Sequence, residues 1–180
     1  PEGIFYSKVE PDEIPEIVQS LLPEGKCVER LFYHDPVTDK PIPYHCDIPF
    51  YNKQQRTVLR TCGNINPENI EDYLASDGYQ ALPKAFDESP EEIIDAVKRS
   101  GLRGLGGVGF PAGRKWEACR RAFGEEKYVI CNADEGDPGA FQDRSVMEGN
   151  PHSVLEGMII AGYAVGAKRG FIYVRAEYPL

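Results

Sequence analysis

The chain has 180 residues, of which 41% are hydrophobic, enough to form the core of one ordinary domain or somewhat more. Its 20 Lys and Arg residues against 29 Asp and Glu residues give a net charge of −9. This acidic balance excludes nucleic acid and an anionic membrane surface as expected partners, because both require a basic face. The sequence also has no apolar run of membrane-spanning length and no signal-peptide pattern, so we expect no direct membrane insertion.

The cysteines are odd in number and scattered, and none of them forms a CxxC pair: Cys27, Cys46, Cys62, Cys119 and Cys131. This pattern favours reduced thiols in a cytoplasmic protein over a disulfide framework. The first residue is Pro, and the last residues, GFIYVRAEYPL, read as a strand that has just finished. We therefore expect the chain to be a segment of a longer protein.

The first third of the chain predicts short elements followed by a linker. Residues 4–9 predict a short strand, and residues 10–22 predict a helix with Pro11 in its first turn and apolar side chains on one side. Residues 28–33 fit a strand or an extended exit. The following sequence is rich in proline and turn residues, so we expect a linker over residues 34–60 and a second domain from residue 61.

Two helices are predicted next. The first would be a short helix capped by Asn66 with Pro67 in its first position. The second covers SPEEIIDAVKRSG, where Ser89 and Glu92 form a capping box and Gly101 ends the helix. These signals are local and specific, so the helix over 89–100 has the best-defined ends.

The remainder of the chain predicts an α/β domain. A helix over GRKWEACRRAF precedes the apolar, β-branched stretch KYVICNA, which predicts a buried strand. A helix rich in small residues, HSVLEGMIIAGYAVGA, is followed by RGFIYVRAE, which predicts a second buried strand. Two strands joined by a long crossover that contains a helix indicate a parallel βαβ unit. We therefore expect a parallel sheet with flanking helices.

The stretch RGLGGVGFPAGRKW combines five glycines with three cations. Its G-x-G-x-x-G pattern follows a predicted helix instead of a strand, which excludes the standard dinucleotide-binding fingerprint. A glycine-rich loop that leads into a helix can nevertheless hold a phosphate through unpaired N–H groups, and Arg114 and Lys115 lie one turn into that helix. The alternative is a flexible surface loop, in which an exposed Phe110 would be unusual.

The stretch CNADEGDPGAFQDR follows the first predicted strand of the βαβ unit. In a parallel sheet, the loop at the carboxyl end of a strand is where ligands bind. Asn132, Asp134, Glu135 and Asp137 crowd this loop, and their carboxylates repel one another unless they bind something. The candidates for what these carboxylates bind are a metal, ligand hydroxyls, and basic neighbours such as Arg144. The alternative is that the stretch is a solvated acidic turn.

The two stretches can be taken together, as GLRGLGGVGFPAGRKW and CNADEGDPGAFQDRSVMEGNPHSVLEGMIIAGYAVGA. They resemble the flavin (FMN)- and NADH-binding subunit of respiratory complex I. They also resemble its relatives in NAD(P)-linked, electron-bifurcating hydrogenases and formate dehydrogenases. The resemblance covers residue 100 to about residue 178, and residues 50–88 resemble the hydrogenase branch more closely. Residues 1–33 resemble the tail of a thioredoxin-like 2Fe–2S domain, without its ligand cysteines.

The resemblance implies a Rossmann-like FMN-binding domain that takes a hydride from NAD(P)H onto FMN and passes electrons to iron–sulfur partner subunits. These would be a thioredoxin-like 2Fe–2S subunit and a hydrogenase or dehydrogenase catalytic subunit. No side chain is implied as an acid or base. The implied contacts to FMN are the backbone of Gly104, Gly106 and Gly107, the side chain of Lys115 at the phosphate, and the side chains of Asn132, Asp134 and Glu135 at the ribityl chain and ring edge. The implied contacts to NADH are Phe110, stacked on the adenine, and Asp137.

This sequence departs from the family at two of the relevant positions. Leu105 stands where the family usually has Arg, and Asp137 is one methylene shorter than the usual Glu. A lost charge-assisted hydrogen bond costs ~1.5–3 kcal/mol, so NADH binding is weakened more than FMN binding. The 4Fe–4S cluster of the family needs four thiolates, and none of the cysteines here matches that motif. We therefore expect the cluster in the full-length protein but no metal ligand within these residues.

Overall fold

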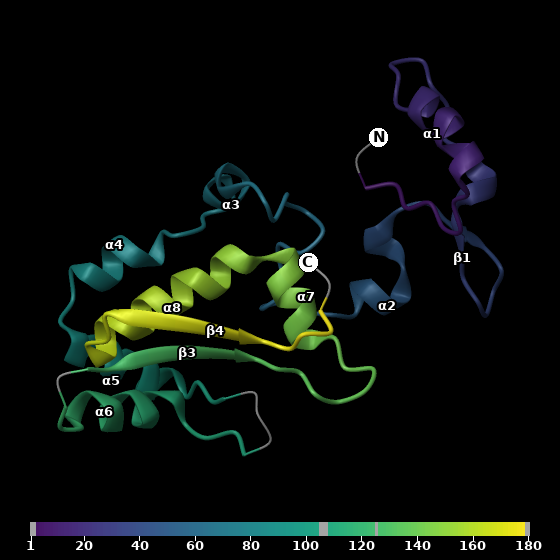
Figure 1. Ribbon diagram of the computed structural model, residues 1–180. Helices are drawn as coiled ribbons and strands as arrows, with labels where there is room; N and C mark the ends of the chain where they lie inside the picture. Colours follow the sequence, from purple (N-terminus) through teal and green to yellow (C-terminus); the bar gives the residue numbers. More distant parts are fainter. Residues whose placement is uncertain (1–2, 105–107, 125, 179–180) are drawn as a thin grey trace. The chain divides into compact units, whose positions relative to one another are not determined.

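The computed structural model describes residues 3–104, 108–124 and 126–178. It divides into two compact units, residues 1–57 and residues 58–180 (Figure 1). The segment predicted as a linker therefore carries structure of its own, since residues 34–57 pack within the first unit. Within the described residues, no helix is long and apolar enough to cross a membrane.

The first unit contains only short elements. Its helices are η1 (Pro11–Glu13), α1 (Ile14–Ser20), η2 (Glu29–Leu31), η3 (His45–Asp47) and α2 (Pro49–Asn52). Strands β1 (Tyr33–His34) and β2 (Pro41–Ile42) form an antiparallel hairpin. Residues 4–9 make two isolated bridges instead of the predicted strand, through Ile4 and Tyr6. The predicted helix over 10–22 is present, but the apolar side chains along it, such as Val18 and Leu22, are exposed.

The second unit is an α/β arrangement with a small parallel sheet. Its elements are α3 (Ile70–Ala75), α4 (Ala81–Phe86), α5 (Pro90–Ser100), α6 (Ala112–Arg121), β3 (Tyr128–Ala133), α7 (Gln142–Gly149), α8 (Pro151–Val165) and β4 (Arg169–Val174). Strands β3 and β4 pair in parallel from Tyr128–Arg169 to Ala133–Val174, which confirms the predicted βαβ unit. Helix α8 packs against both strands, and the core lies where α5 and α8 meet, at Ile93, Ile94 and Ala164.

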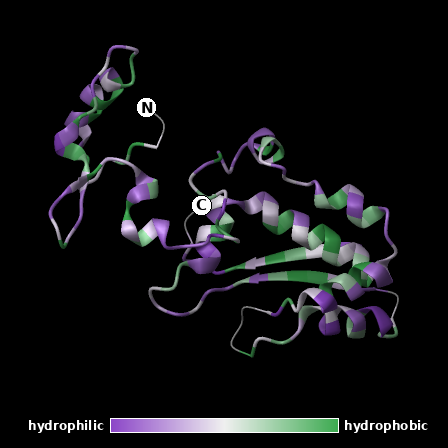
Figure 2. Cartoon of the chain, turned by 180° about the vertical axis from the view of Figure 1, so that it is seen from behind, coloured by the Kyte–Doolittle hydropathy of each residue, from purple (hydrophilic) through white to green (hydrophobic). Residues whose placement is uncertain are grey.

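Both strands are apolar along most of their length (Figure 2), yet the prediction that they are buried is wrong for the described chain. Burial alternates along β3, and its outward side chain Ile130 is 65% exposed. On β4, Phe171 pairs with Ile130 in the register and is 53% exposed. One face of the sheet therefore lies against α8, and the opposite face is uncovered.

Helix ends are explained by local chemistry in most places. Ser89 and Glu92 form the predicted capping box of α5, and Gly101 ends that helix in the left-handed region at φ 70°. The predicted cap at Asn66 is wrong. Its side chain accepts from the N–H of Glu68 within a turn, and α3 starts later, capped by Asn69.

Candidate functional site

The two described ends of the glycine stretch, residues 102–104 and 109–112, pair with each other just before α6. The Ala112 N–H donates to the carbonyl oxygen of Leu102 at 2.9 Å, and the Gly104 N–H donates to that of Phe110 at 3.0 Å. Arg103 pairs with the opposite end of this stretch, and its guanidinium donates to the carbonyl oxygen of Gly109 at 3.1 Å. The loop therefore has a defined backbone path at its base, unlike an unstructured surface loop.

Two glycines of this loop bear on ligand approach. Gly109 has φ +58°, a left-handed conformation that disfavours other residues. Among the described residues, an added Cβ at Gly104 would have the Phe110 carbonyl oxygen as its near neighbour, at 3.9 Å. The predicted contacts Gly106 and Gly107 lie outside the described residues, as does Leu105.

The first turn of α6 provides N–H groups and a cation. Its N-cap is Pro111, whose side chain has no hydrogen-bond acceptor, and the Ala112 N–H already donates to the Leu102 carbonyl oxygen, so among the described residues the amides of this turn left for a ligand are those of Gly113 and Arg114. Lys115 is exposed on the same turn, and Phe110, just before it, is 50% exposed. A helix start of this kind suits an anion, because both the amides and the macrodipole favour negative charge.

The acidic loop begins where β3 ends. The Asn132 side-chain oxygen accepts from the Asp134 N–H at 3.1 Å, and this turns the chain away from the strand. Asp134 and Asp137 are exposed, and the Asp137 carbonyl oxygen accepts from the Ala140 N–H within the next turn. The backbone of this loop is therefore held by local turns, and its two aspartates are exposed to solvent.

Glu135 is occupied by the protein itself. Its carboxylate accepts from the backbone N–H groups of Gln142 at 2.8 Å, Asp143 at 3.1 Å and Arg144 at 3.3 Å, and so caps α7. The Tyr178 hydroxyl donates to the same carboxylate at 3.0 Å. Burial raises the pKa of Glu135, but the amide and hydroxyl donors outweigh it and hold the pKa below its ordinary value. The negative charge on Glu135 is thus stabilised by α7 and by the chain after β4.

Two residues that follow β4 contact this loop, and the sequence analysis did not identify them as site residues. The Arg175 guanidinium donates to the Glu135 backbone oxygen at 2.5 Å, and Tyr178 reaches the Glu135 carboxylate. The sequence contains a pattern that could have identified them, because a cation and an aromatic residue lie within four residues after the second strand of a parallel pair. Adjacent parallel strands end at the same edge of a sheet, so residues after both strands meet there.

The glycine loop and the acidic loop lie at the same end of the second unit, the end toward which the strand arrows point (Figure 1). The structure thus places the described predicted residues at one end of the sheet, and its hydrogen bonds tie Asn132, Asp134 and Glu135 into one loop.

Within the described ranges, no group of three or more His, Cys, Asp or Glu side chains could hold a metal ion. Cys27, Cys46, Cys119 and Cys131 are free thiols.

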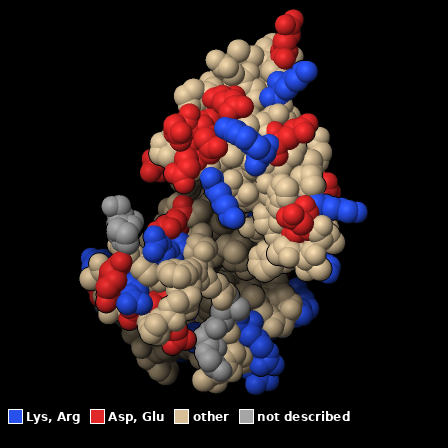
Figure 3. All heavy atoms as spheres, turned by 90° about the vertical axis from the view of Figure 1, so that its right-hand side faces the viewer, with Lys and Arg blue, Asp and Glu red and all other residues tan. Residues whose placement is uncertain are grey.

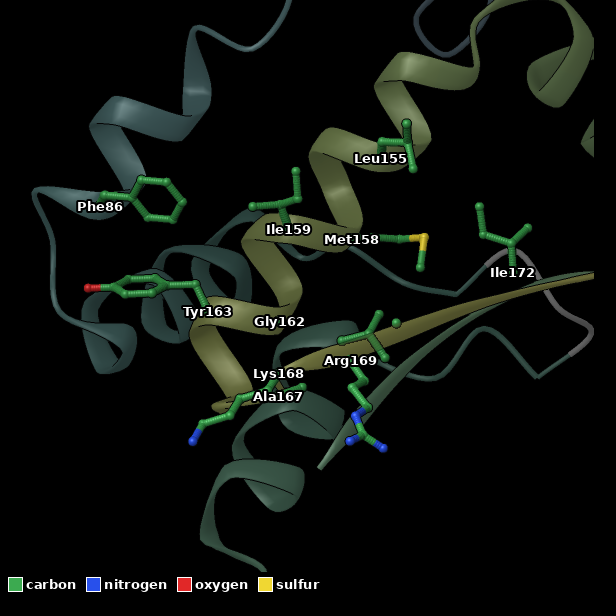
Figure 4. Close-up of a pocket in the computed structure, with 12 residues that line it drawn as sticks. Phe86, Leu155, Met158, Ile159, Gly162, Tyr163, Ala167, Lys168, Arg169 and Ile172 are labelled. Carbon is green, nitrogen blue, oxygen red and sulfur yellow. The ribbon is translucent and has the colours of Figure 1, made fainter. Parts of the chain in front are cut away.

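An open hollow of about 550 Å³ lies elsewhere, between α4, α8 and β4 (Figure 4). Its lining is mainly apolar, with Phe86 and Tyr163 packed edge to face at a centroid distance of 5.1 Å. None of the predicted site residues lines it.

Figure 3 shows acidic and basic side chains interspersed over one face of the molecule, in keeping with the absence of a basic stripe from the sequence.

Comparisons with known proteins identify the family to which the second unit is related. The Nuo51 FMN-binding domain family matches residues 97–180. The NADP-reducing hydrogenase subunit HndC of Solidesulfovibrio fructosivorans is 57% identical over 128 residues, 71% of this chain and 26% of that protein. The NAD-reducing hydrogenase HoxS subunit alpha of Cupriavidus necator is 53% identical over 177 residues, 98% of this chain and 27% of that protein.

A solved structure is similar as well. The crystal structure of an NAD+-reducing NiFe hydrogenase in the air-oxidized state matches with a TM-score of 0.53 and 41% identity. The match covers 61% of this chain and 20% of that one. The chain spans about a quarter of the length of the curated relatives it matches.

Proposed function

Because this chain is a homologue of the Nuo51 FMN-binding domain, we propose that it forms part of an oxidoreductase module that binds FMN and NAD(P)H. Bound FMN would accept a hydride from NAD(P)H and release electrons to iron–sulfur clusters. The module would act in the cytoplasm within a hydrogenase-type or complex I-type complex, beside a thioredoxin-like 2Fe–2S subunit and a hydrogenase or dehydrogenase catalytic subunit. The observation that carries the proposal is that the family match and both candidate loops fall on the same residues.

The proposal assigns parts of the chain as follows. Residues 61–180 would be the N-terminal part of a Rossmann-like FMN- and NADH-binding domain, residues 1–33 the tail of a thioredoxin-like domain, and residues 34–60 a linker between them that is structured up to residue 57. The hydrogenase relative that matches 98% of the chain supports reading both units as parts of one such protein. A 4Fe–4S cluster would be held by residues of the full-length protein other than these.

The start of α6 fits a phosphate. Pro111 offers no side-chain acceptor to the Gly113 and Arg114 amides of the first turn, and Lys115 supplies a cation on the same turn. We propose that a flavin lies along the backbone of Gly104, where the described residues leave an added Cβ no contact closer than 3.9 Å, and of Gly106 and Gly107. The chain would thus bind the phosphate end of FMN through the helix start and its isoalloxazine end through the loops.

The acidic loop fits the hydroxyls and ring edge of FMN. Asn132 and Asp134 stand at the carboxyl end of β3, and Asp134 is exposed. Glu135 is different, because its Oε2 already accepts from three donors of the protein and its Oε1 from one, which leaves acceptor capacity on Oε1. We therefore propose direct roles for Asn132 and Asp134, and for Glu135 a role in holding the loop together with the contact through Oε1 that the resemblance implies.

NAD(P)H would use the remaining exposed residues of the same end. Phe110 presents half of its surface, which suits stacking on an adenine. Asp137 is exposed on the acidic loop and would contact a nucleotide hydroxyl. The role of the chain in this chemistry is to bind and orient the nucleotide, with no side chain proposed as acid or base.

A second candidate function is a structural or assembly segment that keeps the fold but binds no cofactor by itself. The uncovered face of the β3–β4 pair favours it, because parallel sheets are normally covered on both faces. Leu105 favours it too, since it removes the cation that the family usually has in the glycine loop.

An anaerobic absorption spectrum with added FMN, before and after NADH, separates the two functions. We expect a bound-flavin spectrum that bleaches with NADH. Lys115→Ala should weaken FMN binding by about tenfold or more, because it removes a charge-assisted contact to the phosphate. Lys168→Ala is the matched control, since this exposed lysine lies just before β4, at the other end of the strands. No bound flavin in the wild-type protein would leave the assembly role as the better explanation.

A further inference from the structure

Arg175 directly follows β4 and makes three contacts around one loop. Its Nη1 donates to the Glu135 backbone oxygen at 2.5 Å, and its Nε lies 3.2 Å from the Glu177 carboxylate. Its guanidinium carbon lies 5.7 Å from the centre of the Tyr178 ring. The Tyr178 hydroxyl in turn donates to the Glu135 carboxylate, so Arg175, Glu135 and Tyr178 form a closed ring of contacts.

These contacts join the ends of two neighbouring strands. Glu135 is two residues past β3, and Arg175 is the first residue past β4. On its other side Glu135 holds the start of α7, and Arg144 of that helix lies 5.9 Å from the Tyr178 ring centre. The short segment from Asn132 to Glu135 is therefore fixed from both directions.

The contact to the Glu135 carbonyl differs from an ordinary surface ion pair. The Glu177 carboxylate is largely exposed, and a pair of this kind contributes little. A guanidinium that donates to a backbone carbonyl makes a charge-assisted hydrogen bond, and Gly136 next to it has no side chain that could hold the backbone. The bonds of α7 and Tyr178 hold the Glu135 side chain, whereas this bond holds the Glu135 backbone, next to Asp134.

We propose that Arg175 is a positioning residue that fixes the segment from Asn132 to Glu135 in the shape needed to contact the flavin. The proposal rests on the FMN-binding function proposed above. Arg175 acts through the Glu135 backbone and the Tyr178 ring, and it makes no direct contact with the cofactor. Its loss should loosen the loop while the helices and the sheet remain folded.

The first test measures FMN affinity by flavin fluorescence in the purified full-length protein. Arg175→Gln should weaken FMN binding by about tenfold, the effect of one charge-assisted hydrogen bond, and Arg175→Lys should restore part of it. The control is Arg169→Gln, an exposed arginine at the opposite end of the same strand. Because Arg175 is proposed to fix the segment that carries Asp134, Arg175→Gln should add less to the loss when Asp134→Asn is already present. Unchanged affinity, or strictly additive losses, would overturn the proposal.

The second test keeps the two proposals separable. Amide hydrogen exchange of residues 133–137 is measured without FMN in the wild type, Arg175→Gln and Arg169→Gln. Faster exchange confined to this loop in Arg175→Gln supports the positioning role, and equal exchange in all three proteins refutes it. If the wild type binds no FMN, the FMN-binding function fails, and the exchange result alone then decides what Arg175 does.

Discussion

Glu135 is the residue on which the end of β3, the start of α7 and the chain after β4 converge. Replacing it by Gln keeps the size but removes the charge that four donors stabilise. We predict that Glu135→Gln lowers the melting temperature at neutral pH by a few degrees, because an amide is a weaker acceptor and brings N–H groups of its own toward the start of α7.

The pH dependence of this effect has a definite sign. The folded-state pKa of Glu135 lies below its ordinary value of 4.5, so its stabilisation is complete above that pH and is lost as the pH falls through the folded-state pKa. The difference in melting temperature between wild type and Glu135→Gln should therefore shrink below about pH 4.5. Glu148→Gln is the control, since its pair with Arg144 is a surface i,i+4 pair of little value. A difference that does not depend on pH would contradict the prediction.

Single residues also show which signals can be read from sequence. The ends of α5 were predicted correctly because Ser89, Glu92 and Gly101 act within their own turns. Helix α7 was missed because its start has no local cap, and the residue that caps it, Glu135, lies seven positions before Gln142. A cap made across a loop leaves no fixed spacing for sequence analysis to find.

At the scale of elements, the approach of α6 to α5 depends on Gly113. An added Cβ would lie 2.7 Å from the Lys98 backbone nitrogen and 3.0 Å from its Cα, so the two helices would have to separate. We predict that Gly113→Ala lowers the free energy of unfolding by ~1–3 kcal/mol, although alanine is the better helix former.

Urea denaturation would test this prediction, with Gly157→Ala as the matched control. Gly157 is an exposed residue within α8, and nothing lies within 4 Å of an added Cβ there. The control should be neutral or stabilising by up to ~1 kcal/mol. Equal effects of the two substitutions would mean that the contact between α5 and α6 is not tight.

Helix α8 holds α3 and α4 through the carboxylate of Glu156. The Tyr73 hydroxyl donates to it at 2.6 Å, and the N–H groups of Tyr79 and Ala81 donate at 3.0 and 3.1 Å. Burial, and then the bond to Glu156, raise the pKa of Tyr73. We predict that Tyr73→Phe costs ~1.5–3 kcal/mol of unfolding free energy, because Tyr73 is 3% exposed and its bond is charge-assisted.

Two measurements check this prediction. Denaturant unfolding should show a much smaller change for Tyr173→Phe, an exposed tyrosine on β4. The pKa values of Tyr73, Tyr79, Tyr128 and Tyr178 are all raised, so an absorbance titration at alkaline pH should show late-ionising tyrosines, and Tyr73→Phe should reduce the amplitude of that late phase. Similar losses of unfolding free energy for the two substitutions would mean that the hydrogen bond from Tyr73 to Glu156 contributes no more to stability than an exposed tyrosine hydroxyl does.

Sequence patterns gave the type of most elements in the second unit but not their surroundings. The parallel pairing of β3 and β4 follows from apolar strands separated by a helix, and it was predicted correctly. The exposure of Ile130 and Phe171 was not, because an apolar strand has the same pattern whether one face or both are covered. Burial depends on what packs against the sheet, which the strand sequence does not contain.

At the scale of the whole molecule, the chain divides into two units, and the proposed contacts fall in the second. The core at Ile93, Ile94 and Ala164 and both candidate loops all lie within residues 58–180. We predict that a chain of residues 58–180 has the same melting temperature as the corresponding transition of the 180-residue chain, and an FMN affinity within about twofold of it, because residues 1–57 supply none of the proposed contacts.

Calorimetry and an FMN titration on both chains would test this independence. A chain of residues 90–180 is the control, since it also removes α3 and α4, whose backbone and Tyr73 satisfy Glu156. That shorter chain should melt at a lower temperature, because it leaves a carboxylate without its donors and exposes the side of α8 that packs on α4. Loss of FMN binding on removal of residues 1–57 alone would instead place part of the cofactor site in the first unit. In that case the glycine and acidic loops of the second unit would be only part of the cofactor site.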